Sequence, residues 1–174
     1  MKKPIVRTKK GDIFSVNIDD QFVKYFQYVT NDLLQLNSDV IRVFLEKVPK
    51  ESDLSLGEIA KLPVEFYAHT IVSVGVKLGV WNKVGHIKDF DPYVPVFFRT
   101  WLERGLIGID EKKIHPRQPR GWYIWRIEDS ELTRVAQLPE EHKKAEIGTV
   151  FNPFTIEKRI KTGTYGLQNY PYSP

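Results

Sequence analysis

Histidines are the first residues to consider for chemistry, because an imidazole can act as an acid, a base or a metal ligand near neutral pH. The chain has four, spaced 17, 29 and 27 positions apart: His69, His86, His115 and His142. None of them forms an HxH or HExxH pair, and the chain has no GxSxG motif, P-loop or GxGxxG fingerprint. We therefore expect no catalytic residues, no cofactor and no metal site, and we interpret His69 as a strand residue paired with a neighbour.

A segment near position 120 is the strongest candidate for a binding surface. It combines two arginines in a proline-restricted loop with three aromatic residues, and these candidate partner-binding residues are Arg117, Arg120, Trp122, Tyr123 and Trp125. Arginine and exposed aromatic side chains dominate the hot spots of protein interfaces. The alternative is that the aromatic residues pack in the core, as aromatic strand residues mostly do, and that the arginines are simply solvated.

The basic charge of the chain is concentrated at one end. The 174 residues carry a formal net charge of +4, but five of the 26 lysines and arginines lie in the first ten positions, where there is no acidic residue. The other 164 residues then hold 21 basic and 22 acidic side chains, a net charge of −1. We therefore expect a basic N-terminal segment at residues 1–10, attached to a single globular domain at residues 11–174. Such a segment can attract polyanions, but a merely solvated terminus is the simpler interpretation.

Composition excludes several classes of protein. The chain contains no cysteine, which excludes disulfides, thiol catalysis and cysteine-ligated metals. Its basic start is not followed by the apolar stretch of a signal peptide, and no apolar run is long enough to cross a bilayer. We expect a cytoplasmic protein that has no membrane partner.

The elements that must position these residues are mostly strands, as an aromatic content of 13% favours. Alternating apolar residues predict strands at 11–18 and 22–29, joined as a hairpin by the turn residues 19–21. The polar residues 30–32 predict a break, and residues 39–48 predict another strand. The clearest alternation covers residues 66–80 and predicts one long bent strand or two consecutive strands. Two glycines on its second face, Gly75 and Gly79, could allow a bend or a close neighbour.

Two helices have local signals. Ser55 and Glu58 have the spacing of a capping box. Asn152 as N-cap, Pro153 at the first helical position and Gly163 ten residues later define a second short helix. Strands and helices do not alternate along the chain. We therefore predict a mainly β (α+β) fold, with a curved antiparallel sheet or a small barrel and two or three short appended helices.

Three segments are informative when taken together. They are KGDIFSV at 10–16, WYIWRI at 122–127 and GTVFNPFTIEKRIKTGTY at 148–165. In this order they resemble the immunity-protein-26 family of bacterial polymorphic toxin systems, and the last segment is the most specific. Members of that family are thought to bind and neutralise a toxin domain encoded beside them. The resemblance implies a mainly β fold, a cognate toxin protein as partner and no catalytic residues.

We therefore expect a non-enzymatic immunity protein. If its toxin is a basic nuclease, a local acidic cluster would attract it, and the sequence offers two, at 128–131 and at 140–141. One alternative is a small β-barrel nucleic-acid-binding module that uses the N-terminal lysines with Arg117 and Arg120. A further alternative is a toxin-like RNase with a dispersed site, for which His69, His115 and Arg120 are the candidates.

Overall fold

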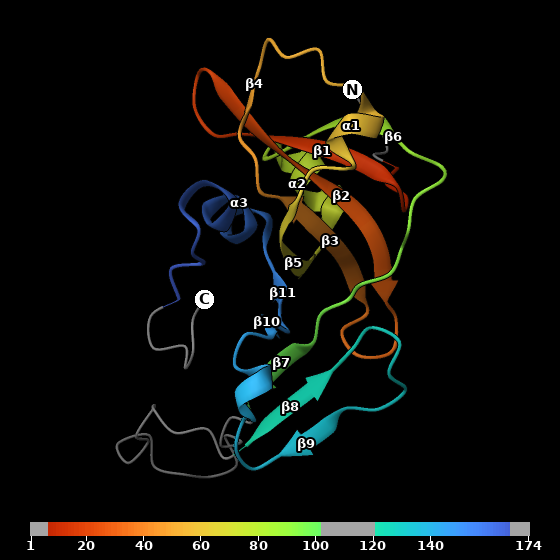
Figure 1. The fold of residues 1–174 in the computed structure, drawn as a ribbon, viewed down its shortest axis with the longest axis vertical. Coiled ribbons are helices and arrows are strands. Elements are labelled where there is room, and N and C mark those ends of the chain that lie inside the picture. The colour runs from red at the N-terminus through yellow and green to blue at the C-terminus, as the bar shows by residue number, and fades with distance from the viewer. Residues whose placement is uncertain (1–6, 102–120, 168–174) are drawn as a thin grey trace.

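A computed structural model describes residues 7–101 and 121–167 of the chain (Figure 1). Strands in this part form two open sheets. The larger sheet has the order β11-β5-β3-β2-β1-β6, with β4 paired to β2, and the smaller sheet has the order β10-β7-β8-β9. Neighbouring strands are antiparallel, except for the short pairs β11–β5 and β10–β7. The mainly β prediction is confirmed, as a pair of open sheets rather than a closed barrel.

The strands of the larger sheet are β1 (Asp12–Asn17), β2 (Phe22–Asp32), β3 (Ser38–Phe44), β4 (Val48–Pro49), β5 (Val64–Thr70), β6 (Asn82–His86) and β11 (Val150–Phe151). Those of the smaller sheet are β7 (Phe98–Trp101), β8 (Trp122–Trp125), β9 (Thr133–Val135) and β10 (Glu146–Ile147). The described helices are α1 (Leu56–Ile59), α2 (Val72–Leu78) and α3 (Pro153–Thr162), with a 3₁₀ turn at Glu140–His142. No helix within the described ranges is both long enough and apolar enough to span a membrane.

Both helices with local signals form as predicted. The Ser55 hydroxyl oxygen accepts a hydrogen bond from the backbone N–H of Glu58, whose carboxylate accepts one from the backbone N–H of Ser55. At the start of α3, the Asn152 side chain accepts from the backbone N–H of Thr155 at 3.0 Å. Gly163 ends this helix in the left-handed conformation, with φ of 78°.

The prediction of one long strand at 66–80 is wrong in its second half. The strand β5 ends at Thr70, and α2 follows from Val72. The alternating apolar pattern also contains a helical stripe, because Val72 and Gly75 are three residues apart and lie on the buried face of α2. Neither glycine bends a strand: Gly75 lies against the Trp81 ring, and Gly79 ends the helix with φ of 72°.

The larger sheet is covered on both faces. On one face, α2 and α3 pack over the largest apolar cluster, which includes Phe14, Phe26, Phe66 and Trp81. On the other face, a second cluster joins Val29 and Val40 of the larger sheet to aromatic residues of the smaller one. The smaller sheet lies at one end of the larger sheet, with its strand β10 next to β11 of the larger sheet (Figure 1).

A β-bulge in β2 changes which face its last residues occupy. Tyr28 pairs with Ile41 and Thr30 pairs with Val40, so two steps along β2 match one step along β3. Before the bulge, Tyr28 packs in the cluster under the helices; after it, Thr30 is opposite Val40 of the second cluster. The expected break at residues 30–32 is therefore wrong: these polar residues continue β2, and the bulge turns Thr30 and Asp32 toward the smaller sheet.

Candidate partner-binding site

One buried carboxylate joins the two sheets. Asp32, at the end of β2, is completely buried, and its Oδ2 accepts a hydrogen bond from His69 Nε2 of β5 at 3.0 Å. The same oxygen lies 3.3 Å from Trp125 Nε1, which belongs to the smaller sheet. Its Oδ1 accepts the backbone N–H of Gln35 at 2.9 Å. A single side chain thus ties together the larger sheet, the smaller sheet and the turn that follows β2.

The surroundings of Asp32 favour its charged form. Burial by itself would raise the pKa of this carboxyl, but the hydrogen bonds from His69, from the backbone of Gln35 and from Trp125 outweigh burial, together with the charge of His69. The pKa of Asp32 is therefore lowered below its ordinary value of 3.8. A carboxyl with a lowered pKa stabilises the folded state above its unfolded pKa, and this contribution is lost as the pH falls through the folded pKa.

This lowered pKa predicts how stability depends on acid. Acid is expected to change the difference in the free energy of unfolding between the wild type and Asp32→Asn through this carboxyl. This difference should shrink as the pH falls below 3.8, because only the wild type takes up a proton there as it unfolds. Urea unfolding of both proteins between about pH 3 and pH 7 measures the difference. A difference that does not shrink in acid would contradict the lowered pKa.

The turn after β2 holds two leucines in solvent. Leu33 and Leu34 are 69% and 65% exposed. Asp32 fixes the turn from one side, and Gln35 fixes it from the other by donating its side-chain N–H to the carbonyl oxygen of Asp129 at 3.1 Å. Asn37 closes it with φ of 45°, a left-handed conformation that asparagine tolerates. We call Leu33 and Leu34 the leucine tip; it is an exposed apolar feature on a restrained backbone.

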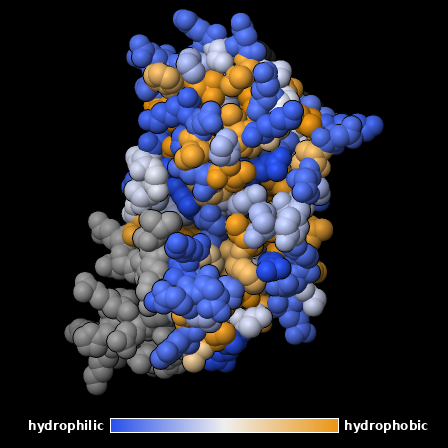
Figure 2. Space-filling view, in the orientation of Figure 1, coloured by the Kyte–Doolittle hydropathy of each residue, from blue (hydrophilic) through white to orange (hydrophobic). Residues whose placement is uncertain are grey.

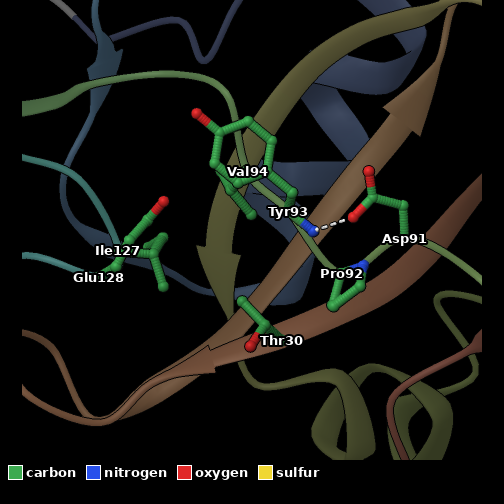
Figure 3. A pocket seen from close by; sticks show the side chains of 7 residues that line it. All are labelled: Thr30, Asp91, Pro92, Tyr93, Val94, Ile127 and Glu128. Atoms are coloured by element: carbon green, nitrogen blue, oxygen red, sulfur yellow. Dashed lines mark hydrogen bonds between the residues drawn. The ribbon is translucent and has the colours of Figure 1, made fainter.

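A cavity of about 310 Å³ opens near this turn (Figure 3). Three segments contribute to it: β2, the chain before β7 and the chain after β8. The seven described residues that line it are Thr30, Asp91, Pro92, Tyr93, Val94, Ile127 and Glu128. Two of the lining residues, Val94 and Ile127, also pack in the apolar cluster between the two sheets. The cavity and the leucine tip together form the candidate partner-binding site.

Three of the five sequence-predicted binding residues are among the described residues, and none of these three lines the cavity. Arg117 and Arg120 fall outside the described residues. Trp122 and Trp125 are 2% and 1% exposed and pack on opposite faces of β8, in two different apolar clusters. Tyr123 is partly exposed. The core-packing interpretation therefore fits both tryptophans, and Trp125 contributes to the site indirectly through its hydrogen bond to Asp32.

The other described histidines have structural partners as well. His86 Nδ1 lies 3.1 Å from Oδ1 of the buried Asp12, whose second oxygen forms an ion pair with Lys83 at 2.7 Å. This cluster fastens the edge strand β6 to β1. His142 packs edge-on against Phe97. The described residues contain no group of three or more potential metal ligands.

The sequence contained a partial signal for this site. The predicted acidic cluster at 128–131 includes Glu128, which lines the cavity. The leucine tip was missed, although two adjacent leucines in a polar turn between strands were a visible anomaly. Tyr93 and Thr30 had no local signal, because the cavity depends on segments that are distant in the chain.

Comparison with protein-family models, curated proteins and solved structures finds no match for this chain.

Proposed function

We propose that this protein is a non-enzymatic immunity protein that binds and neutralises a cognate bacterial toxin domain, and that it does so with the leucine tip and the adjacent cavity. The observation that carries the proposal is the exposure of Leu33 and Leu34 on a turn that buried hydrogen bonds restrain. Exposed large apolar side chains are ordinary when single, but adjacent ones beside a cavity are typical of interaction sites. A restrained turn loses little conformational entropy on binding, which favours affinity.

The exposed apolar residues of the site, Leu33 and Leu34, are only two side chains. In the view of Figure 2, hydrophobic residues are scattered among hydrophilic ones over the described surface. A site of this kind suits a partner that is recognised by a few anchoring contacts within a polar rim. The acidic residues near the cavity add charge complementarity toward a basic partner, which raises the association rate.

The resemblance to immunity proteins supports the same proposal through the framework of the fold. Its three segments correspond to β1, to β8 and to β11 with α3. The last segment is a packing unit: Arg159 donates a hydrogen bond to Glu146 at 3.0 Å, and its guanidinium carbon lies 3.8 Å from the centre of the Phe66 ring. Burial is the main influence on Glu146 and raises its pKa, although Arg159 opposes this. The segments that carry the resemblance thus belong to the framework of the fold, whereas the proposed contact is an exposed turn outside them.

Co-expression with the product of the adjacent gene tests the function. A stable complex in size-exclusion chromatography, together with rescue of growth when that product is toxic, is the expected result. A toxic neighbour that is neither bound nor neutralised would overturn the proposal. Deleting residues 1–10 separates this function from nucleic-acid binding. The complex with the toxin should survive the deletion, whereas affinity for nucleic acid would fall with the deletion and with added salt.

The leucine tip is expected to supply binding energy. Replacing both residues, Leu33→Ser with Leu34→Ser, should weaken the complex by about tenfold or more, because it removes two apolar anchors. Stability should change little, since both side chains are exposed in the free protein. The matched control is Leu45→Ser with Leu78→Ser, two leucines that are 51% and 54% exposed elsewhere. Calorimetric titration measures both pairs, and equal affinities would exclude the tip from the interface.

A further inference from the structure

The cavity is lined by apolar, acidic and aromatic side chains. Its walls are apolar where Pro92, Val94 and Ile127 contribute, while Asp91 and Glu128 supply two carboxylates and Tyr93 supplies an aromatic ring (Figure 3). None of the seven lining residues is basic. At about 310 Å³ the cavity is at the lower end of the range for ligand sites, about 300–1,000 Å³. This space suits a single side chain better than a large cofactor.

The basic residue nearest to Glu128 in sequence does not lie at the cavity. Arg126 precedes Ile127, but its guanidinium carbon lies 4.3 Å from the centre of the Phe97 ring, and it is not a lining residue. Phe97 packs with the apolar cluster on the face of β8 that points away from the larger sheet. Asp91 accepts a hydrogen bond from the backbone N–H of Tyr93 at 2.9 Å, a contact that orients it at the cavity without cancelling its charge.

We propose that this cavity binds an arginine side chain presented by the partner protein. The inference rests on the proposed function, of which it names the anchoring contact. A guanidinium group can stack on the half-exposed Tyr93 ring and donate a charge-assisted hydrogen bond to Asp91 or to Glu128, while the other carboxylate attracts its charge. Its apolar stem can pack against the walls that Val94 and Ile127 form. A lysine could satisfy the carboxylates, but it lacks the planar group that stacks on an aromatic ring.

Small probes test the cavity without the partner. The full-length protein is titrated with N-acetyl-arginine amide and with its uncharged isostere N-acetyl-citrulline amide, and backbone amide resonances are followed by NMR. We expect the arginine probe to bind with a Kd on the order of millimolar, to shift the resonances of residues 91–94 and 127–128, and to bind at least about fivefold more tightly than citrulline. Equal binding of the two probes, shifts confined to other residues or an absence of binding would overturn the inference.

Matched variants test whether the carboxylates of the cavity cause the preference for arginine. Asp91→Asn with Glu128→Gln should abolish the preference for arginine over citrulline. The control, Asp89→Asn with Glu131→Gln, makes the same change in net charge at exposed acids that do not line the cavity, and it should keep the preference. Tyr93→Phe should keep binding while Tyr93→Leu should weaken it, because only the ring is required. A loss of preference in the control pair would point to general charge attraction and overturn the assignment.

The outcomes distinguish this inference from the proposed function. If the arginine probe binds but the neighbouring gene product forms no complex, the cavity chemistry stands and the toxin partner is wrong. If the complex forms and the pair Asp91→Asn with Glu128→Gln leaves its affinity unchanged, the immunity function stands and the arginine site is wrong. We expect that pair to weaken the complex by about tenfold, with a smaller dependence on salt.

Discussion

Replacing Asp32 with alanine is expected to lower the free energy of unfolding by about 3–5 kcal/mol, the range for breaking a buried, hydrogen-bonded ionic group. The change removes one acceptor from three donors at once: His69 Nε2, Trp125 Nε1 and the backbone N–H of Gln35. The His69 and Trp125 side chains are 0% and 1% exposed, so water cannot readily replace the lost hydrogen bonds. Urea unfolding at neutral pH, followed by tryptophan fluorescence, measures the loss.

Two further variants make this expectation specific. Asp32→Asn keeps the size of the side chain and one acceptor oxygen, so it should lose less stability than Asp32→Ala. Asp20→Ala changes an exposed aspartate in the turn between β1 and β2 and should stay within about 0.5 kcal/mol of the wild type. If Asp32→Ala also stayed within that margin, the carboxylate would not be the link between the sheets.

Asp32 also connects the stability of the fold to the proposed binding site. Because its Oδ1 holds the turn that carries Leu33 and Leu34, a variant that still folds should leave the leucine tip less ordered. The tip would then have to be ordered on binding, at a cost in affinity. The turn that we propose as the contact with a partner is thus restrained by a completely buried side chain.

The sequence alone predicted what depends on local chemistry. The capping box at Ser55 and the caps of α3 at Asn152 and Gly163 form within a few residues, so the sequence pattern was sufficient. The role of Asp32 could not be predicted in the same way. The bulge that turns it toward the smaller sheet depends on its pairing with β3, and its hydrogen bond to Trp125 spans 93 positions. Such long-range contacts leave no periodic signal in the sequence.

The segment from Val72 to Leu78 shows a second reason why prediction from the sequence fails, namely that tertiary packing overrides local propensity. Valine at alternate positions favours a strand, and β-branched residues have low helix propensity. Tertiary packing decides otherwise, because the helix buries Val72 and brings Gly75 against the buried Trp81. Of the two roles that the sequence allowed for Gly75, a bend or a close neighbour, the structure shows the second, because the Trp81 ring lies against it.

Gly75→Ala is therefore expected to destabilise the protein by about 3 kcal/mol, at the upper end of the usual cost of overpacking. A methyl carbon at this position would lie 2.0 Å from two atoms of the Trp81 ring. The ring cannot easily move aside, because its Nε1 donates a hydrogen bond to the Val72 carbonyl at 3.0 Å and its edge packs on Phe26. This cost opposes the gain of about 0.8–1 kcal/mol that alanine normally brings to a helix interior.

The control separates the clash from helix propensity. Gly57 of α1 has its nearest neighbouring atom, the Ser55 hydroxyl oxygen, 4.0 Å from the position of a new methyl carbon. Gly57→Ala should therefore leave stability unchanged or raise it by up to about 1 kcal/mol. Combining Gly75→Ala with Trp81→Ala should cost clearly less than the sum of the two single changes, since the second removes the ring that the first strikes. Strict additivity, or a Gly75→Ala variant as stable as the wild type, would show that α2 does not rest on Trp81 at this glycine.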